Sequence, residues 1–374
     1  MAGSSPVWHP AYSTGRSPRR RLAGGSSRRS RYAAGVIRIE LDEPTLARTR
    51  IAISPLWEVM TSLYVLARNP GEAPWPYAGW ARHARRVLAE VPATGPVQVL
   101  TAESRAPDFL SPVPPSPTPT LAEELAVLRA TPAEVIAEQI PRYHDPTDLP
   151  GWLRPFVTDR QAALDRLADG VQAYWDAAIA PWWPAMRAAL DEEVLHRARA
   201  LAADGPDALL ADLHDRVRWE RPVLTLIKPL EQSFQAVNQR LLLIPLIFSR
   251  GALACSTDHP EIVAVSYQAR GAAVLADRPA PGTAPEVPGA DRLAVLVGRG
   301  RAQVLRALAR PATTAGLAAT LGLAPSTVSE HLAALLAAGV VHRRRVGRRV
   351  LYGLEPAGVA LVTLIGADPA TASA

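Results

Sequence analysis

Five arginines lie close together near the end of the chain, and their side chains could bind a polyanion. The group consists of Arg343, Arg344, Arg345, Arg348 and Arg349. Val346 and Gly347 lie in the middle of this group, which predicts a two-residue turn between two strands. Guanidinium groups held this closely repel one another, and phosphates or a narrow minor groove would relieve the repulsion. We therefore expect a basic hairpin that contacts the backbone or the minor groove of DNA.

Two short helices are predicted immediately before the arginines. In the first, Leu317, Ala318 and Leu321 share one face, and Gly322 then breaks the period. Pro325 suits the first turn of the second helix. The apolar residues of that helix recur at helical spacing and form a stripe that packs inward: Val328, Leu332, Leu335 and Leu336. This order of elements predicts a helix-turn-helix whose second helix enters the major groove.

The second helix leaves a narrow polar face for base edges, and the hairpin follows it directly. Gly339 can end the helix, after which Val340 and Val341 lead into a strand that returns through Tyr352 and Leu354. The alternative is an ordinary solvated helix face and a solubilising loop, but the order of helix, turn, helix and basic hairpin favours a winged helix. The predicted DNA-contacting residues are Thr314, Ser326, Thr327, Ser329, Glu330 and His331, together with the five arginines.

The run TTAGLAATLGLAPSTVSEHLAALLAAGVVHRRRVGRRVLYGL resembles the winged-helix domain of ArsR-type bacterial transcriptional regulators. The phrase LGLAPSTVSEHLAALLAAGVV carries the resemblance. It implies two preceding helices at 291–297 and 301–309, and a terminal helix at 356–365 that helps to pair two subunits. One departure is Ala324, where the family often has a Ser that caps the recognition helix. Losing that cap costs on the order of 1 kcal/mol.

The resembled family also includes metal sensors, and their usual ligands are missing from this sequence. Residues 328–338 contain no Cys, and from Glu355 onward the chain has one Asp and no His. We therefore expect no metal and no cofactor at the family's usual sites. Nor does the sequence contain a Gly-rich phosphate loop, a nucleophile elbow or an HExxH motif, so we expect no enzyme activity.

Charge is distributed unevenly along the 374 residues. Residues 1–35 contain seven Arg and no acid, and residues 291–374 have a net charge of +6, which leaves the middle at −7. Only the terminal module and the tail would be drawn to DNA, because the acidic middle is repelled by it. The longest apolar run, 241–248, is far shorter than the roughly 18 residues that span a bilayer. We expect a cytoplasmic protein.

The predicted organisation is α+β: mainly helical with small β elements. A disordered tail (1–35) precedes a mostly helical regulatory, ligand-binding or dimerisation domain (36–277). A Pro/Gly linker (278–289), the winged helix-turn-helix (290–366) and a second tail (367–374) follow. Within the middle domain the patterns predict these elements: a strand at 36–41, a helix at 53–66, an extended loop at 111–120, helices from 131 and over 159–201, and a hairpin or small sheet from 241–248 and 262–267.

The middle domain offers few residues that could do chemistry. Its start, IRIELDEPTLARTRIAISPLWEVMTSLYVL, resembles the large N-terminal domain found beside ArsR-like modules in some regulators of high-GC bacteria, and the resemblance supplies no ligand. Trp182 and Trp183, between two prolines, could line a ligand pocket or fill the core. Glu193 and His196 have the spacing of a di-iron ligand pair but no second copy, which favours a surface helix.

Two further candidates depend on neighbours that the sequence does not identify. Asp212 and His214 could contribute to a zinc site only with partners from elsewhere in the chain. Cys255 is the one cysteine, so no internal disulfide can form, and a small core residue is favoured over a redox switch because we expect no basic neighbour.

The sequence as a whole favours a homodimeric transcriptional repressor that binds double-stranded DNA and an unidentified small-molecule effector. An enzyme tethered to DNA by the terminal module is one alternative. A nucleoid protein that binds DNA without sequence preference is another.

Overall fold

A computed structural model describes residues 35–364 except 102–105, 212, 214–215, 229–230, 250–252 and 277–290. The predicted linker and tails, apart from Gly35, lie outside the described residues, as do Asp212 and His214. The chain divides into two compact units. The first comprises Met1–Tyr64, Ala93–Tyr174 and Glu192–Gln268, and the second comprises Val65–Pro92, Trp175–Asp191 and Ala269–Ala374. The domain boundaries inferred from the sequence stay a prediction.

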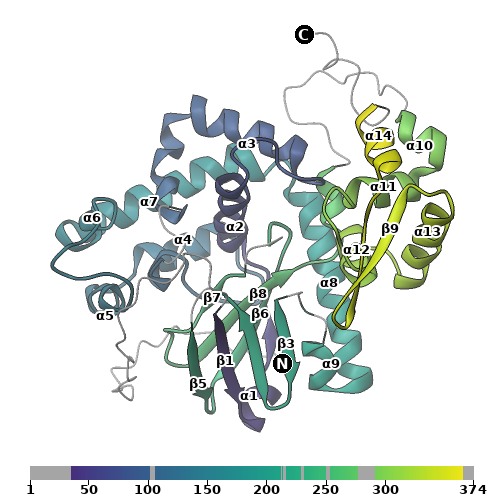
Figure 1. The fold of residues 1–374 in the computed structure, drawn as a ribbon. Coiled ribbons are helices and arrows are strands. Elements are labelled where there is room, and N and C mark those ends of the chain that lie inside the picture. The colour runs from purple at the N-terminus through teal and green to yellow at the C-terminus, as the bar shows by residue number, and fades with distance from the viewer. Residues whose placement is uncertain are drawn as a thin grey trace, which may run out of the picture. The chain divides into compact units, whose positions relative to one another are not determined.

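Two four-stranded sheets form the centre of the first unit (Figure 1). The first sheet has the order β3-β4-β1-β5 and contains β1 (Val36–Leu41), β3 (Val217–Glu220), β4 (Val223–Ile227) and β5 (Gln232–Ala236). The second sheet has the order β2-β6-β8-β7 and contains β2 (Arg50–Ile51), β6 (Arg240–Leu246), β7 (Cys255–Ser256) and β8 (Ile262–Gln268). The α+β class is confirmed, with more strand than the sequence patterns suggested.

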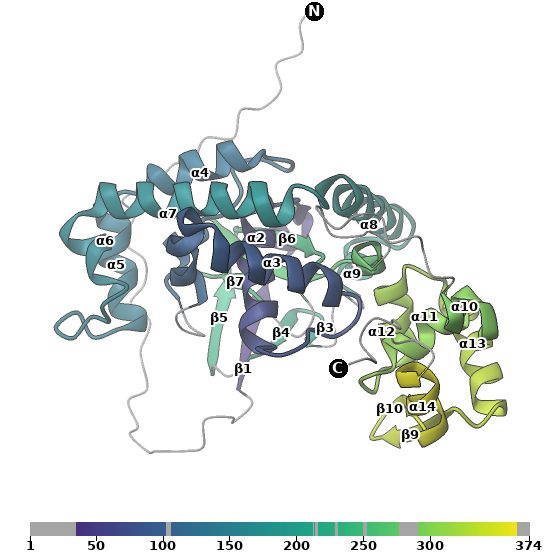
Figure 2. The same ribbon diagram turned by 90° about the horizontal axis from the view of Figure 1, so that it is seen from above.

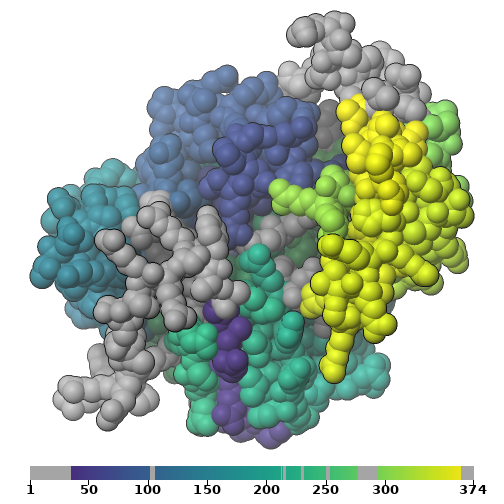
Figure 3. All heavy atoms as spheres, in the orientation of Figure 1, coloured from purple at the N-terminus to yellow at the C-terminus, as the bar shows by residue number. Residues whose placement is uncertain are grey.

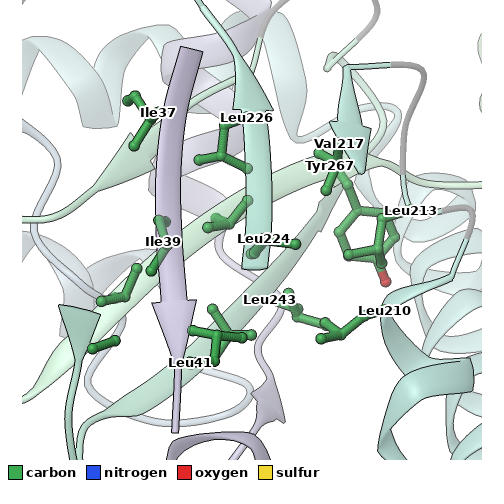
Figure 4. Close-up of a cluster of buried hydrophobic side chains, with 14 of the residues drawn as sticks. Ile37, Ile39, Leu41, Leu210, Leu213, Val217, Leu224, Leu226, Leu243 and Tyr267 are labelled. Atoms are coloured by element: carbon green, nitrogen blue, oxygen red, sulfur yellow. The ribbon is translucent and has the colours of Figure 1, made fainter. Parts of the chain in front are cut away.

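The two sheets differ in how many of their faces are buried, and the sequence reflects this. In β1 the side chains of Ile37 and Ile39 are buried while Arg38 and Glu40 are exposed, so β1 alternates as predicted. Figure 4 shows Ile37, Ile39 and Leu226 among the buried side chains that also include Leu243 and Tyr267 of the second sheet. The apolar core of the unit therefore includes side chains from both sheets.

The second sheet is buried on both faces, which explains its continuous apolar strands. Leu242 and Leu246 of β6 pack against Trp57 and Met60 of α2 (Pro55–Arg68), on the side opposite Leu243. The expected small sheet at 241–248 and 262–267 is confirmed, whereas the alternative of a hairpin is wrong. Because β6 and β8 run parallel, a tight turn cannot join them, and the connection instead contains β7, which pairs antiparallel with β8.

The first unit also contains several helices. They are α1 (Glu43–Ala47), α4 (Leu121–Arg129), α5 (Ala133–Tyr143), α6 (Arg154–Thr158), α7 (Arg160–Tyr174) and α9 (Pro206–Leu210), together with parts of α2 and α8 (Trp183–Asp204). The predicted helix at 53–66 and the predicted loop at 111–120 are both confirmed. In the predicted helical stretch 159–201, a π-helical turn, Trp175–Ile179, and the residues around Pro181 separate α7 from α8. Pro184 lies in the first turn of α8, where proline is tolerated.

Two buried carboxyl groups belong to Glu58 of α2 and Glu124 of α4. Glu58 accepts hydrogen bonds from the backbone N–H groups of Ile247 (2.6 Å) and Phe248 (3.2 Å). Glu124 accepts one from the Ser54 hydroxyl (2.5 Å) and one from the Leu56 N–H (2.7 Å). Burial raises the pKa of each carboxyl to about 8, although the hydrogen bonds from their partners oppose the shift.

These raised pKa values predict how stability depends on pH. The folded state holds the two protons more tightly than the unfolded chain, whose carboxyls titrate near 4.5. The raised pKa of each carboxyl therefore stabilises the folded state fully below pH 4.5. This stabilisation is lost as the pH rises toward 8, by at most about 1.4 kcal/mol per pH unit for each group. We expect Glu58→Gln, which stays neutral, to flatten the dependence measured by urea unfolding between pH 5 and pH 8.

Glu123 provides the matched control, because it is adjacent to Glu124 but exposed. Backbone and side-chain hydrogen bonds from Thr120 lower the pKa of Glu123, so Glu123→Gln should leave the slope between pH 5 and pH 8 unchanged. An identical slope in wild type and Glu58→Gln would contradict the assignment.

Candidate nucleic-acid interface

Three helices of the second unit form a helix-turn-helix around a small apolar core. They are α11 (Arg299–Ala307), α12 (Thr314–Leu321) and α13 (Pro325–Ala337). Leu317 and Leu321 of α12 pack with Val328 and Leu332 of α13, as the apolar spacing predicted. The Thr313 hydroxyl caps α12 by accepting a hydrogen bond from the Gly316 N–H (3.0 Å). This cap was not among the features expected from the sequence.

The turn between α12 and α13 has the predicted form. Gly322 adopts a φ of 69°, a left-handed conformation that glycine adopts without strain. The Leu323 N–H then donates to the Ala318 carbonyl (3.1 Å), and Pro325 begins α13. Ala324 makes no side-chain capping bond, so the start of α13 lacks the hydroxyl cap noted in the sequence.

The predicted base-reading residues differ in exposure. Ser326, Ser329 and Glu330 are exposed on α13, and Thr327 is half-buried. His331 is also half-buried, and its imidazole lies against Gly300 of α11, where a Cβ would come within 2.5 Å of Nε2. Packing against α11 therefore engages part of the His331 side chain. Thr314 is half-buried as the first residue of α12. The DNA contacts of all these residues stay a prediction.

The basic hairpin consists of β9 (Val341–Val346) and β10 (Arg349–Leu354), paired antiparallel. Its turn lies one residue later than expected. Val346 pairs with Arg349, so the turn residues are Gly347 and Arg348 rather than Val346 and Gly347. Gly347 has a φ of 59°, and a two-residue hairpin turn needs a positive φ at its first position. The position of the glycine therefore fixes the register.

The register separates the arginines across the hairpin. The cross-strand pairs are Arg343 with Tyr352, Arg344 with Leu351, Arg345 with Val350, and Arg349 with Val346. No two arginines are directly opposite each other, which reduces their mutual repulsion. All five arginines are exposed.

Most of this charge is available to a partner. Among the described residues, the side chains of Arg343, Arg344, Arg345 and Arg348 make no ion pair, and of these four side chains only that of Arg345 makes a hydrogen bond, to the Gly347 carbonyl (3.2 Å). Figure 3 shows the tip of the hairpin as a narrow yellow projection. The tip thus presents exposed guanidinium groups to solvent.

Two interactions that the sequence did not reveal hold the module together. Ala312 and Tyr352 exchange backbone hydrogen bonds of 3.0 Å and 2.8 Å, so residue 312 joins the base of the hairpin to the segment before α12. Asp291 caps α10 (Arg292–Val297) and forms two hydrogen bonds with the Arg306 guanidinium (2.7 and 2.8 Å). This guanidinium lowers the pKa of Asp291. Arg306 is therefore engaged within the protein.

Comparison with known proteins identifies this segment. Residues 299–343 match the family model described as "Bacterial regulatory protein, arsR family". Over residues 299–343 the chain is similar to an arsR-family helix-turn-helix, and we use that name for this segment. Comparison with curated proteins and with solved structures gave no match. The match indicates a DNA-binding transcriptional regulator, and it covers α11, α12, α13 and the first residues of β9.

Two helices flank the arsR-family helix-turn-helix, as the resemblance implied (Figure 2). They are α10, which precedes α11, and α14 (Pro356–Leu364), which follows the hairpin. Gly358 packs tightly on the Val340 carbonyl, where any Cβ would clash. Both helices expose apolar side chains: Val295 is 75% exposed, Leu296 59% and Val359 49%. These side chains supply an apolar surface on the terminal module.

The tryptophans predicted as pocket residues pack against other aromatic side chains. Trp182 is buried, with its ring centroid 5.1 Å from that of His83, and Trp183 lies 4.9 Å from Trp175. His83 belongs to α3 (Ala78–Glu90) of the same unit. Trp182 is therefore a core residue, whereas Trp183 is half-buried, and a role of either in ligand binding stays a prediction.

The expectation that Glu193 and His196 lie on a surface helix holds for His196 but is wrong for Glu193. Glu193 is buried in an ion pair with Arg197 (2.8 Å), whereas His196 is exposed. Across the described ranges, no three His, Cys, Asp or Glu side chains come together as metal ligands would. The same ranges contain no helix long and apolar enough to cross a membrane.

Proposed function

We propose that this chain is a sequence-specific transcriptional repressor that binds DNA as a homodimer. The exposed arginine hairpin beside an arsR-family helix-turn-helix is the observation that carries the proposal. In this proposal the exposed start of α13 enters the major groove, where Ser326, Thr327 and Glu330 contact base edges. The hairpin arginines bind backbone phosphates or the adjacent minor groove.

The exposed apolar side chains support a dimer. Val295, Leu296 and Val359 belong to the two helices that flank the arsR-family helix-turn-helix, and a second subunit would bury them. A two-fold dimer places two recognition helices on successive major grooves, which predicts a near-palindromic site. The resembled family acts mostly by repression, and we extend that role to this chain by analogy.

We further propose that the first unit responds to an effector rather than catalysing a reaction, and that the protein acts in the cytoplasm. The absence of nucleotide-loop, nucleophile-elbow and HExxH motifs from the sequence supports a non-enzymatic role. An effector that binds the first unit would change the affinity of the terminal module for DNA.

Selection from random duplexes by the full-length protein tests the proposal directly. We expect enrichment of one near-palindromic motif, and recovery of the same motif from genomic sites bound in the native cell. Binding without any enriched motif would instead favour the nucleoid alternative. No measurable binding to any duplex at low ionic strength would refute DNA binding altogether.

A further inference from the structure

The only lysine and the only cysteine of the chain lie next to each other in the first unit. Lys228 Nζ donates a hydrogen bond to Cys255 Sγ over 3.3 Å. The sequence interpretation that Cys255 has no basic neighbour is therefore wrong. Lys228 directly follows β4 in the first sheet, whereas Cys255 belongs to β7, the edge strand of the second sheet. The pairing arises from the packing of two sheets, so residues 27 positions apart come together.

The short strand that carries Cys255 is anchored on both sides. Within the sheet, Cys255 pairs with Val265 of β8. Immediately after it, the half-buried Asp108 carboxylate accepts hydrogen bonds from the Ser256 hydroxyl (2.8 Å) and the Thr257 N–H (3.0 Å). Asp258 in turn accepts a hydrogen bond from the Tyr143 hydroxyl (2.9 Å). These hydrogen bonds hold the backbone around Cys255 in place and keep its thiol beside the amine.

The pair is also accessible to small molecules. Both side chains are half-buried, and Cys255 forms no disulfide. Oxidation of protein thiols by peroxides is selective for cysteines that are partly exposed and lie beside a cationic side chain. A sulfenic acid formed in this way normally condenses with a second thiol, which this chain does not contain, or with a nitrogen. Lys228 supplies a nitrogen within hydrogen-bonding distance.

We propose that Lys228 and Cys255 form an oxidation-sensitive modification site that closes to a covalent sulfur–nitrogen bond. In the first step the thiol attacks a hydroperoxide, the O–O bond breaks, and sulfur becomes a sulfenic acid while the peroxide leaves as water or an alcohol. In the second step the Lys228 ammonium first loses a proton to water, and the resulting amine then attacks sulfur while the S–O bond breaks with release of water. Thiol, amine and hydrogen peroxide thus give one sulfenamide and two waters. The bond ties the end of β4 to β7.

Mass spectrometry of the full-length protein after treatment with a small excess of hydrogen peroxide tests the site. We expect an intact mass lower by two hydrogen atoms, loss of reactivity toward a thiol-alkylating reagent, and full reversal by dithiothreitol. Cleavage after arginine should yield peptides 219–240 and 251–270 joined to each other, since the first contains Lys228 and the second Cys255.

Two variants provide the matched controls. Lys228→Arg keeps the positive charge but lacks the primary amine, so we expect it to accumulate sulfenic and sulfinic acids without joined peptides. Cys255→Ser should show no mass change, and circular dichroism checks that both variants fold. The proposal is overturned if wild type and Lys228→Arg give the same oxidised products, or if wild type forms only disulfide-linked subunits through Cys255. None of these measurements depends on DNA binding.

Discussion

Replacing Arg348 and Arg349 with alanine is expected to weaken binding to all DNA sequences alike. Both side chains are exposed at the tip of the hairpin, and the apolar core of the module does not include them. Each phosphate that the variant no longer neutralises should reduce the slope of log affinity against log salt by about 0.9. With two such phosphates per subunit, the slope for a dimer would fall by roughly 3.6. Fluorescence anisotropy with the selected site and a scrambled duplex, over a range of salt concentrations, measures both quantities.

A second pair of variants separates general charge from position. The double variant Arg199→Ala, Arg218→Ala removes two exposed arginines from the first unit, and we expect the salt slope of this variant to match that of wild type.

Thr327→Ala, at the start of α13, should keep the salt slope but alter the selected motif, with discrimination at one base pair changing by about 1–3 kcal/mol. Equal loss of sequence preference from the Arg348/Arg349 and Thr327 variants would contradict the division between backbone-binding hairpin and base-reading helix.

Glu193→Ala is expected to cause the largest loss of stability of any single substitution considered for the first unit. The Glu193 side chain is 0% exposed and accepts a 2.8 Å hydrogen bond from Arg197, whose own side chain is 9% exposed. Arg197 also donates to the Ala211 carbonyl (2.8 Å) and lies 5.3 Å from the centre of the Tyr267 ring. Removing the carboxylate leaves a buried positive charge without its counterion, which costs about 3–5 kcal/mol. Chemical unfolding measures the loss.

The same helix contains a matched control for this ion pair. Arg187 and Asp191 have the same i,i+4 spacing on α8 but are exposed to solvent, so Asp191→Ala should cost no more than about 1 kcal/mol. Replacing Glu193 and Arg197 together by Leu and Met should recover most of the stability, because neither charge then remains buried. If Glu193→Ala costs no more than Asp191→Ala, the pair has no special structural role.

The C-terminal module was predictable because its information is local. Helical spacing at Leu317 and Leu321, the turn at Gly322 and the proline at 325 each depend on a few neighbouring residues, and all are found as expected. The exception is the hairpin register, which was displaced by one residue because Gly347 must occupy the first turn position. A local sequence pattern does not determine the register of a hairpin to within one residue.

The first unit was less predictable because its contacts join distant parts of the chain. Strand β1 pairs with β4 and β5, roughly 190 residues later, and no local pattern indicates that pairing. Glu193 illustrates the same limit. Its i,i+3 relation to His196 offered a possible ligand pair, but Glu193 is buried and pairs with Arg197, whose guanidinium lies over the Tyr267 ring.

By itself the sequence determined the DNA-binding module, its charge and its order of elements, because short-range periodicity and turn residues specify these features. Only the tertiary structure decided which charges are paired inside the protein and which remain for a partner: Arg306 binds Asp291, whereas Arg343 and Arg348 stay exposed. It also brought Lys228 to Cys255. Such pairings depend on how sheets and helices pack, and packing is set by the whole chain rather than by neighbouring residues.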